Sequence, residues 1–189
     1  GFGKLGGYEL NFCSDVDLYF VYEGEGFCRK DGHDTQLPNP EFFTRVCQDA
    51  NKMLTQRTAH GFLYNVDLRL RPEGSAGRLV ASLSAMEQYY FSRGQTWERL
   101  ALLRARPVAG DTAVGGELLE MVHACRYPRH PPEDAAEDVA GLKERTEAET
   151  LGHQKMDHDI KTGYGGIREI EFFTQVLQLI NAGHYPFLQ

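Results

Sequence analysis

The sequence lacks paired cysteines, long apolar runs and an excess of positive charge. Its 189 residues include four cysteines without CxxC spacing, so we expect reduced thiols in place of disulfides or a zinc site. No apolar run approaches the length of a membrane span and no signal-peptide pattern opens the chain, so we expect a cytoplasmic protein without a membrane partner. The net charge of −7 argues against nucleic-acid binding, because proteins that bind phosphate backbones are usually basic.

The first 22 residues hold a glycine pair, Gly6-Gly7, followed by Asp15 and Asp17. Residues 15–21 are β-branched and aromatic, which predicts a strand. Side chains two apart on a strand share a face, so the two carboxylates repel unless a cation lies between them. Mg²⁺ is typically held by carboxylates together with substrate phosphates, and a glycine backbone lets a phosphate approach closely. The stretch indicates metal-dependent nucleotide chemistry; an acidic surface strand is the alternative.

A second stretch, residues 66–71, alternates strictly between apolar and polar side chains. The polar face carries Asp67, Arg69 and Arg71. A further carboxylate can complete a two-metal site, and arginines suit phosphates through bidentate hydrogen bonds. An ordinary half-buried strand with a solvated polar face produces the same alternation, so this pattern alone leaves both interpretations open.

Four stretches together resemble the bacterial glutamine synthetase adenylyltransferase/deadenylylase family. They are GFGKLGGYELNFCSDVDL, GFLYNVDLRLRPEGSAG, WERLALLRARPVAGD and DIKTGYGGIREIEFFTQVLQLI, in the family's order, and they span residues 1 to 180. The family belongs to the polymerase-beta-like nucleotidyltransferases. The resemblance therefore implies an α/β (α+β) fold, with a small mixed sheet that carries the carboxylates.

The same resemblance implies a role for each candidate residue. The catalytic and metal-binding carboxylates are Asp15, Asp17 and Asp67. The residues expected near the nucleotide or its phosphates are Gly6, Gly7, Ser14, Arg69, Arg71 and Lys161. Cys13 departs from the family pattern, because it replaces the first serine of a Ser-Ser-Asp run. The expected cofactors are two Mg²⁺ ions, or Mn²⁺, with ATP, ADP and phosphate as substrates or products.

Full-length members of the family carry two such domains with opposed activities on one tyrosine of glutamine synthetase. One domain transfers AMP from ATP to the tyrosine, and the other removes it by phosphorolysis and releases ADP. Arg168-Glu169 and Asn11 favour the deadenylylating copy. The adenylylating copy and a non-catalytic regulatory module are the alternatives. The resemblance also implies a PII-type signal protein as a second partner besides glutamine synthetase.

Composition along the chain predicts three segments. Residues 1–126 form the nucleotidyltransferase core, the proline-rich residues 127–132 a linker, and residues 133–189 a helical extension. We expect a loop or hairpin over residues 23–40 and a helix over residues 40–58. A helix over residues 167–180 should pack through Ile170, Phe173, Val176, Leu177 and Ile180. A fold of this kind needs a helix on its sheet before Gly1, so we expect the sequence to be a fragment.

Overall fold

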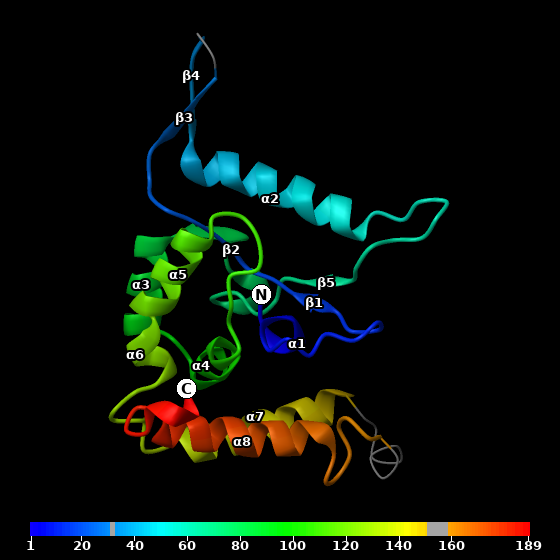
Figure 1. Cartoon of the computed structure of the whole chain (residues 1–189), viewed down its shortest axis with the longest axis vertical. Coiled ribbons are helices and arrows are strands. Elements are labelled where there is room, and N and C mark those ends of the chain that lie inside the picture. Colours follow the sequence, from blue (N-terminus) through cyan, green and yellow to red (C-terminus); the bar gives the residue numbers. More distant parts are fainter. Residues whose placement is uncertain (31–32, 151–158) are drawn as a thin grey trace. The chain divides into compact units, whose positions relative to one another are not determined.

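The computed structural model describes residues 1–30, 33–150 and 159–189, and the chain divides into two compact units (Figure 1). The first unit comprises Gly1–Gly94 and Arg104–Val122, and the second comprises Gln95–Leu103 and His123–Gln189. Helices and small sheets together confirm the expected α/β class. Within the described ranges, no helix combines the length and the apolar character that crossing a bilayer requires.

Short parallel strand pairs lie at the centre of the first unit. β1 (Val16–Asp17) pairs with β5 (Val66–Asp67), and β2 (Phe20–Tyr22) pairs with β6 (Val80–Ser82). The strand predicted over residues 15–21 is therefore interrupted at residues 18–19. The strand predicted over residues 66–71 ends at Asp67, because the chain turns there and leads into the 3₁₀ helix η1 (Gly74–Ala76).

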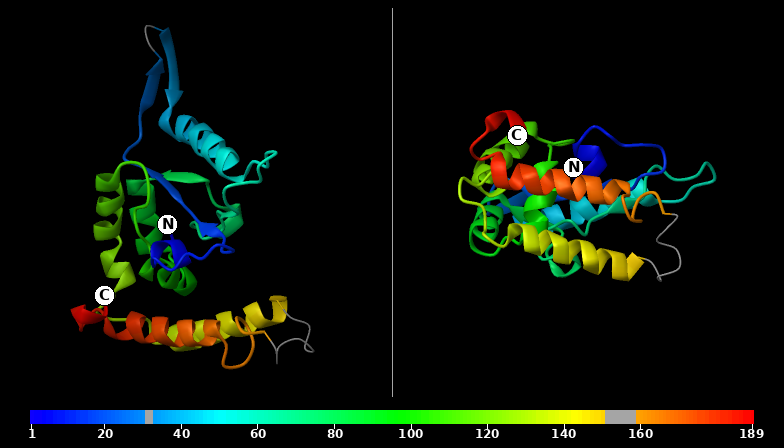
Figure 2. Two further views of the ribbon diagram at one scale, coloured as in Figure 1. Left: turned by 45° about the vertical axis from the view of Figure 1, so that its right-hand side comes forward. Right: turned by 90° about the horizontal axis from the view of Figure 1, so that it is seen from below.

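The expected hairpin after the central strands is present. β3 (Phe27–Lys30) and β4 (His33–Pro38) pair antiparallel and lead directly into α2 (Asn39–Thr55), as the views in Figure 2 show. This helix was predicted over residues 40–58. It ends earlier because Gln56 adopts an extended backbone, with φ −61° and ψ 126°.

Helices complete the first unit around a small aromatic core. They are α1 (Gly3–Gly6), α2, α3 (Leu83–Ser92) and α5 (Thr112–Met121). Tyr22, Cys47 and Val80 are buried together, so β2, α2 and β6 pack at one place. The ring of Phe43 stacks on that of Tyr22 with centroids 5.0 Å apart, which fixes α2 against the strand.

The second unit is helical. It contains α4 (Thr96–Leu103), α6 (His123–Arg126), α7 (Ala135–Thr150), α8 (Ile167–Asn181) and the 3₁₀ helix η3 (Pro186–Leu188). α7 and α8 lie side by side (Figure 2), joined by an ion pair of 2.5 Å between Lys143 Nζ and Glu169 Oε1. Leu100, Val139 and Leu179 form the centre of the core between α4, α7 and α8.

The predicted packing face of α8 is largely wrong. Ile170, Phe173 and Leu177 are 63%, 69% and 45% exposed, whereas Leu179 is fully buried. Phe172 and Val176 pack with Leu179 against the neighbouring helices. The helix is apolar on more than one face, so its periodicity alone does not indicate which face meets a partner.

We predict that Leu179→Ala destabilises the second unit by about 3 kcal/mol, because a fully buried leucine leaves a cavity when it is truncated. Leu177→Ala on the exposed face is the matched control, with an expected change of about 0.5 kcal/mol. Trp97 is the single tryptophan and lies in α4, so its fluorescence during urea unfolding reports on this unit. Equal losses in the two variants would show that the packing face is misassigned.

Candidate active site

Two of the three predicted carboxylates lie on neighbouring strands. β1 and β5 run parallel, and their register places Asp17 opposite Asp67. Val16 N donates to Asn65 O at 2.8 Å and Leu18 N donates to Asp67 O at 3.0 Å, which fixes this register. Paired residues on adjacent strands present their side chains to the same face, about 5 Å apart. Asp15 comes two residues before Asp17, is exposed, and lies just outside the strand.

The N-terminal turn packs on Asp17. Phe2 N donates to Asp17 O at 3.0 Å, and Gly3 has a left-handed backbone with φ +50°. A Cβ atom on Gly3 would lie only 2.5 Å from Asp17 Oδ2, so a glycine is required there. The sequence analysis selected Gly6 and Gly7 and missed this residue, although its place in the GFGKLGG motif offered a signal.

Arg69 holds the carboxylate of Asp67. Its Nε donates to Oδ1 at 3.0 Å and to Oδ2 at 2.9 Å, and its Nη2 donates to Oδ2 at 2.6 Å. The backbone N–H of Arg69 also donates to Oδ1 at 2.8 Å. These hydrogen bonds lower the pKa of the Asp67 carboxyl below its usual range, against the opposing effect of partial burial.

Arg71 has a different environment from Arg69. Its guanidinium donates to three backbone carbonyls, from Nε to Gly77, from Nη1 to Leu68 and from Nη2 to Ser75. These bonds close the turn that follows β5. Arg71 therefore stabilises the local backbone, and its predicted contact with phosphate stays a prediction.

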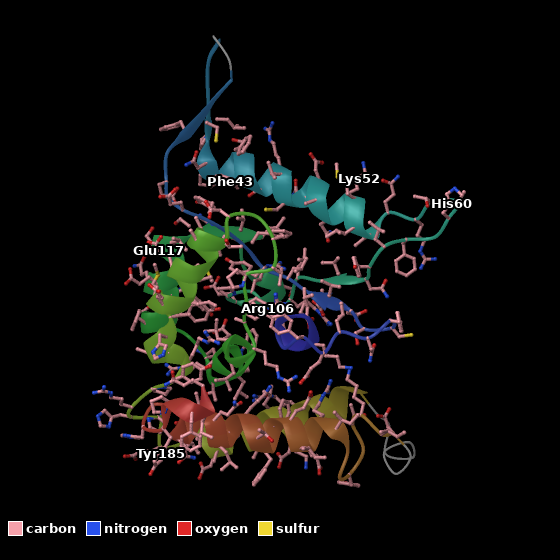
Figure 3. The ribbon with its side chains drawn as sticks, in the orientation of Figure 1. Phe43, Lys52, His60, Arg106, Glu117 and Tyr185 are labelled. Atoms are coloured by element: carbon pink, nitrogen blue, oxygen red, sulfur yellow. The ribbon has the colours of Figure 1, made fainter. Side chains whose placement is uncertain are left out.

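The glycine pair packs against the chain at residues 104–106. A Cβ atom on Gly6 would lie 1.7 Å from Arg104 O, whereas one on Gly7 would meet nothing closer than 3.4 Å. Arg106, labelled in Figure 3, donates from Nε to Gly6 O at 3.1 Å and from Nη2 to Leu5 O at 2.9 Å. Gly6 thus has a packing reason of its own, independent of the phosphate contact predicted for the pair.

Ser14 lies in a turn that precedes the aspartates. Its Oγ donates to Asn11 Oδ1 at 2.7 Å, and the backbone N–H of Cys13 donates to the same oxygen at 3.2 Å. Asn11 therefore organises the approach of the chain to Asp15. The nucleotide contact predicted for Ser14 stays a prediction.

Lys161 belongs to the second unit and is exposed in the loop before α8. The backbone N–H groups of Ile167 and Arg168 at the start of the helix donate to the carbonyls of Ile160 and Lys161, at 2.9 and 3.0 Å. These bonds use N–H groups that would otherwise be available to an anion. The glycine-rich entry thus forms a hydrogen-bonded turn, and the phosphate contact of Lys161 stays a prediction.

The chemistry of the paired carboxylates suits a hard divalent cation. Carboxylate oxygens are the ligands that Mg²⁺ and Mn²⁺ prefer, and β1 and β5 bring two such groups together. Across the ranges that the structure describes, no three His, Cys, Asp or Glu side chains converge closely enough to hold a metal ion. Asp67 is engaged by Arg69, so a cation that binds Asp67 has to replace this guanidinium.

An apolar cavity of about 580 Å³ also lies in the first unit. Leu18, Phe20, Phe43, Leu54 and Leu118 contribute to its lining, and none of the predicted site residues does. The lining that the structure describes is mainly apolar and contains none of the predicted carboxylates, so we assign the candidate site to the paired strands.

Comparison with known proteins gives two family matches. Residues 1–121 match the family model for glutamate-ammonia ligase adenylyltransferase, and residues 136–185 match that for the GlnD PII-uridylyltransferase. The two matches cover different parts of the chain and do not overlap.

Curated relatives match along almost the whole chain. Proteins named bifunctional glutamine synthetase adenylyltransferase/adenylyl-removing enzyme are 49% identical in Xanthomonas campestris pv. campestris (strain B100), 44% in Nitrosococcus oceani and 46% in Pseudomonas putida. The alignments cover 97%, 100% and 100% of this chain, and 19% of each relative. The chain thus spans about a fifth of the length of these curated relatives.

We predict that Gly6→Ala lowers the free energy of unfolding by about 2 kcal/mol or more without any nucleotide present, because the new methyl group meets the Arg104 carbonyl. Gly7→Ala is the matched control, with an expected change of about 0.5 kcal/mol. Urea unfolding followed by far-ultraviolet circular dichroism measures both. A Gly6→Ala variant as stable as the parent would remove the packing explanation and leave only a phosphate role.

The Asp67–Arg69 pair predicts a dependence of stability on pH. A carboxyl group whose pKa is lowered by folding stabilises the native state above its unfolded pKa of about 4, and this contribution is lost as the pH falls through the lower folded pKa. In buffer with a chelator that removes divalent metal, the parent should be more stable than Asp67→Asn at neutral pH, and this difference in unfolding free energy should become smaller below about pH 4. A difference that stays constant from neutral pH to pH 3 would contradict this expectation.

Proposed function

The chain belongs to the glutamate-ammonia ligase adenylyltransferase family, and on that premise we propose that it catalyses metal-dependent nucleotidyl transfer at a tyrosine of glutamine synthetase. The observation that carries the proposal is the parallel register that sets Asp17 opposite Asp67, with Asp15 two residues away. Two carboxylates set opposite one another on adjacent strands repel each other unless a cation compensates them. The names of the curated relatives support the same chemistry.

In this proposal, Asp15, Asp17 and Asp67 hold the divalent cation, which when bound neutralises the phosphates and helps to align the attacking and leaving oxygens. Arg69 carries an exposed guanidinium beside the carboxylates and is suited to bind phosphate oxygens in a bidentate way. Gly3 has no Cβ atom that would displace the Asp17 carboxylate from its position. Arg71 maintains the turn that carries Arg69, through its bonds to backbone carbonyls.

The direction that we propose is removal of AMP. An oxygen of inorganic phosphate attacks the phosphorus of tyrosyl-AMP, the bond from phosphorus to the tyrosine oxygen breaks, and the tyrosine oxygen takes up a proton. The products are ADP and unmodified tyrosine. Support comes from the GGIREIEF stretch, in which Arg168-Glu169 resembles the deadenylylating copy of the family. The relatives' names contain both activities, and the same carboxylates serve either direction.

We also propose the division of the chain into a nucleotidyltransferase core at residues 1–126, a linker at residues 127–132 and a helical extension to residue 189. The family matches over residues 1–121 and 136–185 support this division, because the proline-rich segment lies between them. The second match, to a PII-uridylyltransferase family, supports a PII-type signal protein as a partner.

A paired assay with purified glutamine synthetase tests the proposal. One reaction contains the adenylylated enzyme, Mg²⁺ and phosphate, and the other contains the unmodified enzyme, Mg²⁺ and ATP. We predict release of ADP in the first reaction and no transfer of AMP in the second. Asp17→Asn should lower the activity by at least about a hundredfold, since the cation loses a ligand.

Asp49→Asn is the matched control, because Asp49 is an exposed acid on α2 outside the candidate site. This variant should retain the activity of the parent chain. Transfer of AMP in the second reaction alone would overturn the proposed direction. The proposed function would be overturned if neither reaction produced ADP release or AMP transfer and calorimetry detected no Mg²⁺-dependent binding of ATP or ADP.

A further inference from the structure

Arg69 and Arg71 occupy equivalent places in the sequence pattern but have opposite environments. The guanidinium of Arg71 donates to three backbone carbonyls, and these partners stay in place whether or not a ligand binds. The side chain of Arg69 is 77% exposed and forms an ion pair with the carboxylate of Asp67, whose side chain is 17% exposed. The guanidinium end of the pair is open to water, which can take over its hydrogen bonds, so Arg69 can move away from Asp67 at modest cost.

The two oxygens of Asp67 are held differently. Oδ1 accepts the backbone N–H of Arg69 at 2.8 Å, a bond that survives when the side chain moves away. The shortest bond to Oδ2 comes from the Arg69 side chain, from Nη2 at 2.6 Å. If the guanidinium leaves, Oδ2 becomes available while the backbone bond keeps the carboxylate oriented.

The Arg69 guanidinium lies where the carboxylates need a positive charge. Asp67 lies opposite Asp17 in the parallel register, and the charges of both Asp15 and Asp17 act on the Arg69 side chain. Carboxylates so placed need a cation near them, and Arg69 provides one in the absence of metal. A divalent cation bound at the same carboxylates performs this task with more charge.

We propose that Arg69 is an exchangeable cation, which pairs with Asp67 in the metal-free chain, is displaced from Oδ2 when a divalent cation binds, and then turns to the phosphate of the substrate. The proposal rests on the proposed function, which makes Asp67 a metal ligand. Its consequence is that Arg69 opposes the binding of metal alone and favours the binding of phosphate-bearing ligands.

Nitrogen-15 NMR of arginine Nε–H groups tests this exchange directly on the 189-residue chain. The signal missing from the spectrum of Arg69→Gln identifies Arg69. During a titration with Mg²⁺ alone, the Arg69 signal should shift with the same midpoint as metal binding, because Nε leaves the carboxylate. Arg71 is the control within the same molecule, and its signal should stay in place because its carbonyl partners do not change.

A second test measures the affinities for metal and for nucleotide, which should change in opposite directions when Arg69 is replaced. Arg69→Gln should strengthen the binding of Mn²⁺ alone by about two- to fivefold, the range expected on loss of a weak competing ion pair. The same variant should weaken the binding of ADP measured at saturating Mg²⁺. Arg78→Gln removes an equal charge from an exposed arginine of the same unit and should change neither affinity appreciably.

The outcomes separate this inference from the function on which it rests. If metal binds and the Arg69 signal does not move, the exchange is overturned and the proposed function stands. Equal changes of metal affinity in Arg69→Gln and Arg78→Gln would also overturn it, since the effect would then be one of net charge. If no Mg²⁺ or Mn²⁺ binds to the parent chain, with or without ADP, the metal-dependent function itself fails.

Discussion

The alignment of two like charges on adjacent strands is the constraint on which the first unit depends. β1 and β5 are short, and their parallel register places Asp17 and Asp67 side by side. Such a pairing is unfavourable in itself, so the surrounding chain has to compensate it. Arg69 supplies a positive charge at Asp67. Gly3 has no Cβ atom, so the N-terminal turn can pack closely against the Asp17 carboxylate. A strand pair that bound nothing would gain stability from neutral residues at both places.

Stability for this arrangement comes from the N-terminal segment and the chain that crosses it. Arg106 donates to the carbonyls of Leu5 and Gly6, and its guanidinium lies 3.7 Å from the centre of the Tyr8 ring. This side chain links residues a hundred positions apart in the sequence and holds the turn that packs on Asp17. The hydrogen bonds of Arg106 therefore give it a structural role in the first unit.

The sequence allowed prediction of the features that short stretches determine. Turn-forming composition indicated a loop or hairpin where β3 and β4 pair, and apolar periodicity predicted α2. Spacing selected Asp17 and Asp67 as candidates, but their pairing in the parallel register was seen only in the structure. The packing face of α8 could not be predicted, because the helix is apolar on several sides and its neighbours decide which side is buried. Gly3 was missed for a related reason, since its proximity to Asp17 arises only when the chain folds back on itself.

The two arginines after β5 show why a pattern of alternation cannot assign roles. Both follow Asp67 at even spacing, so a regular strand would present them on one face with equal access to a ligand. The strand ends at Asp67, and the turn that follows directs Arg71 to backbone carbonyls and Arg69 to the carboxylate. The early end of the strand thus gives the two arginines different partners. Arg71 stabilises the loop, and Arg69 pairs with a carboxylate that, in our proposal, it exchanges for phosphate. The proposed exchange depends on this difference, because a guanidinium bound to backbone carbonyls has no carboxylate partner that a cation could take from it.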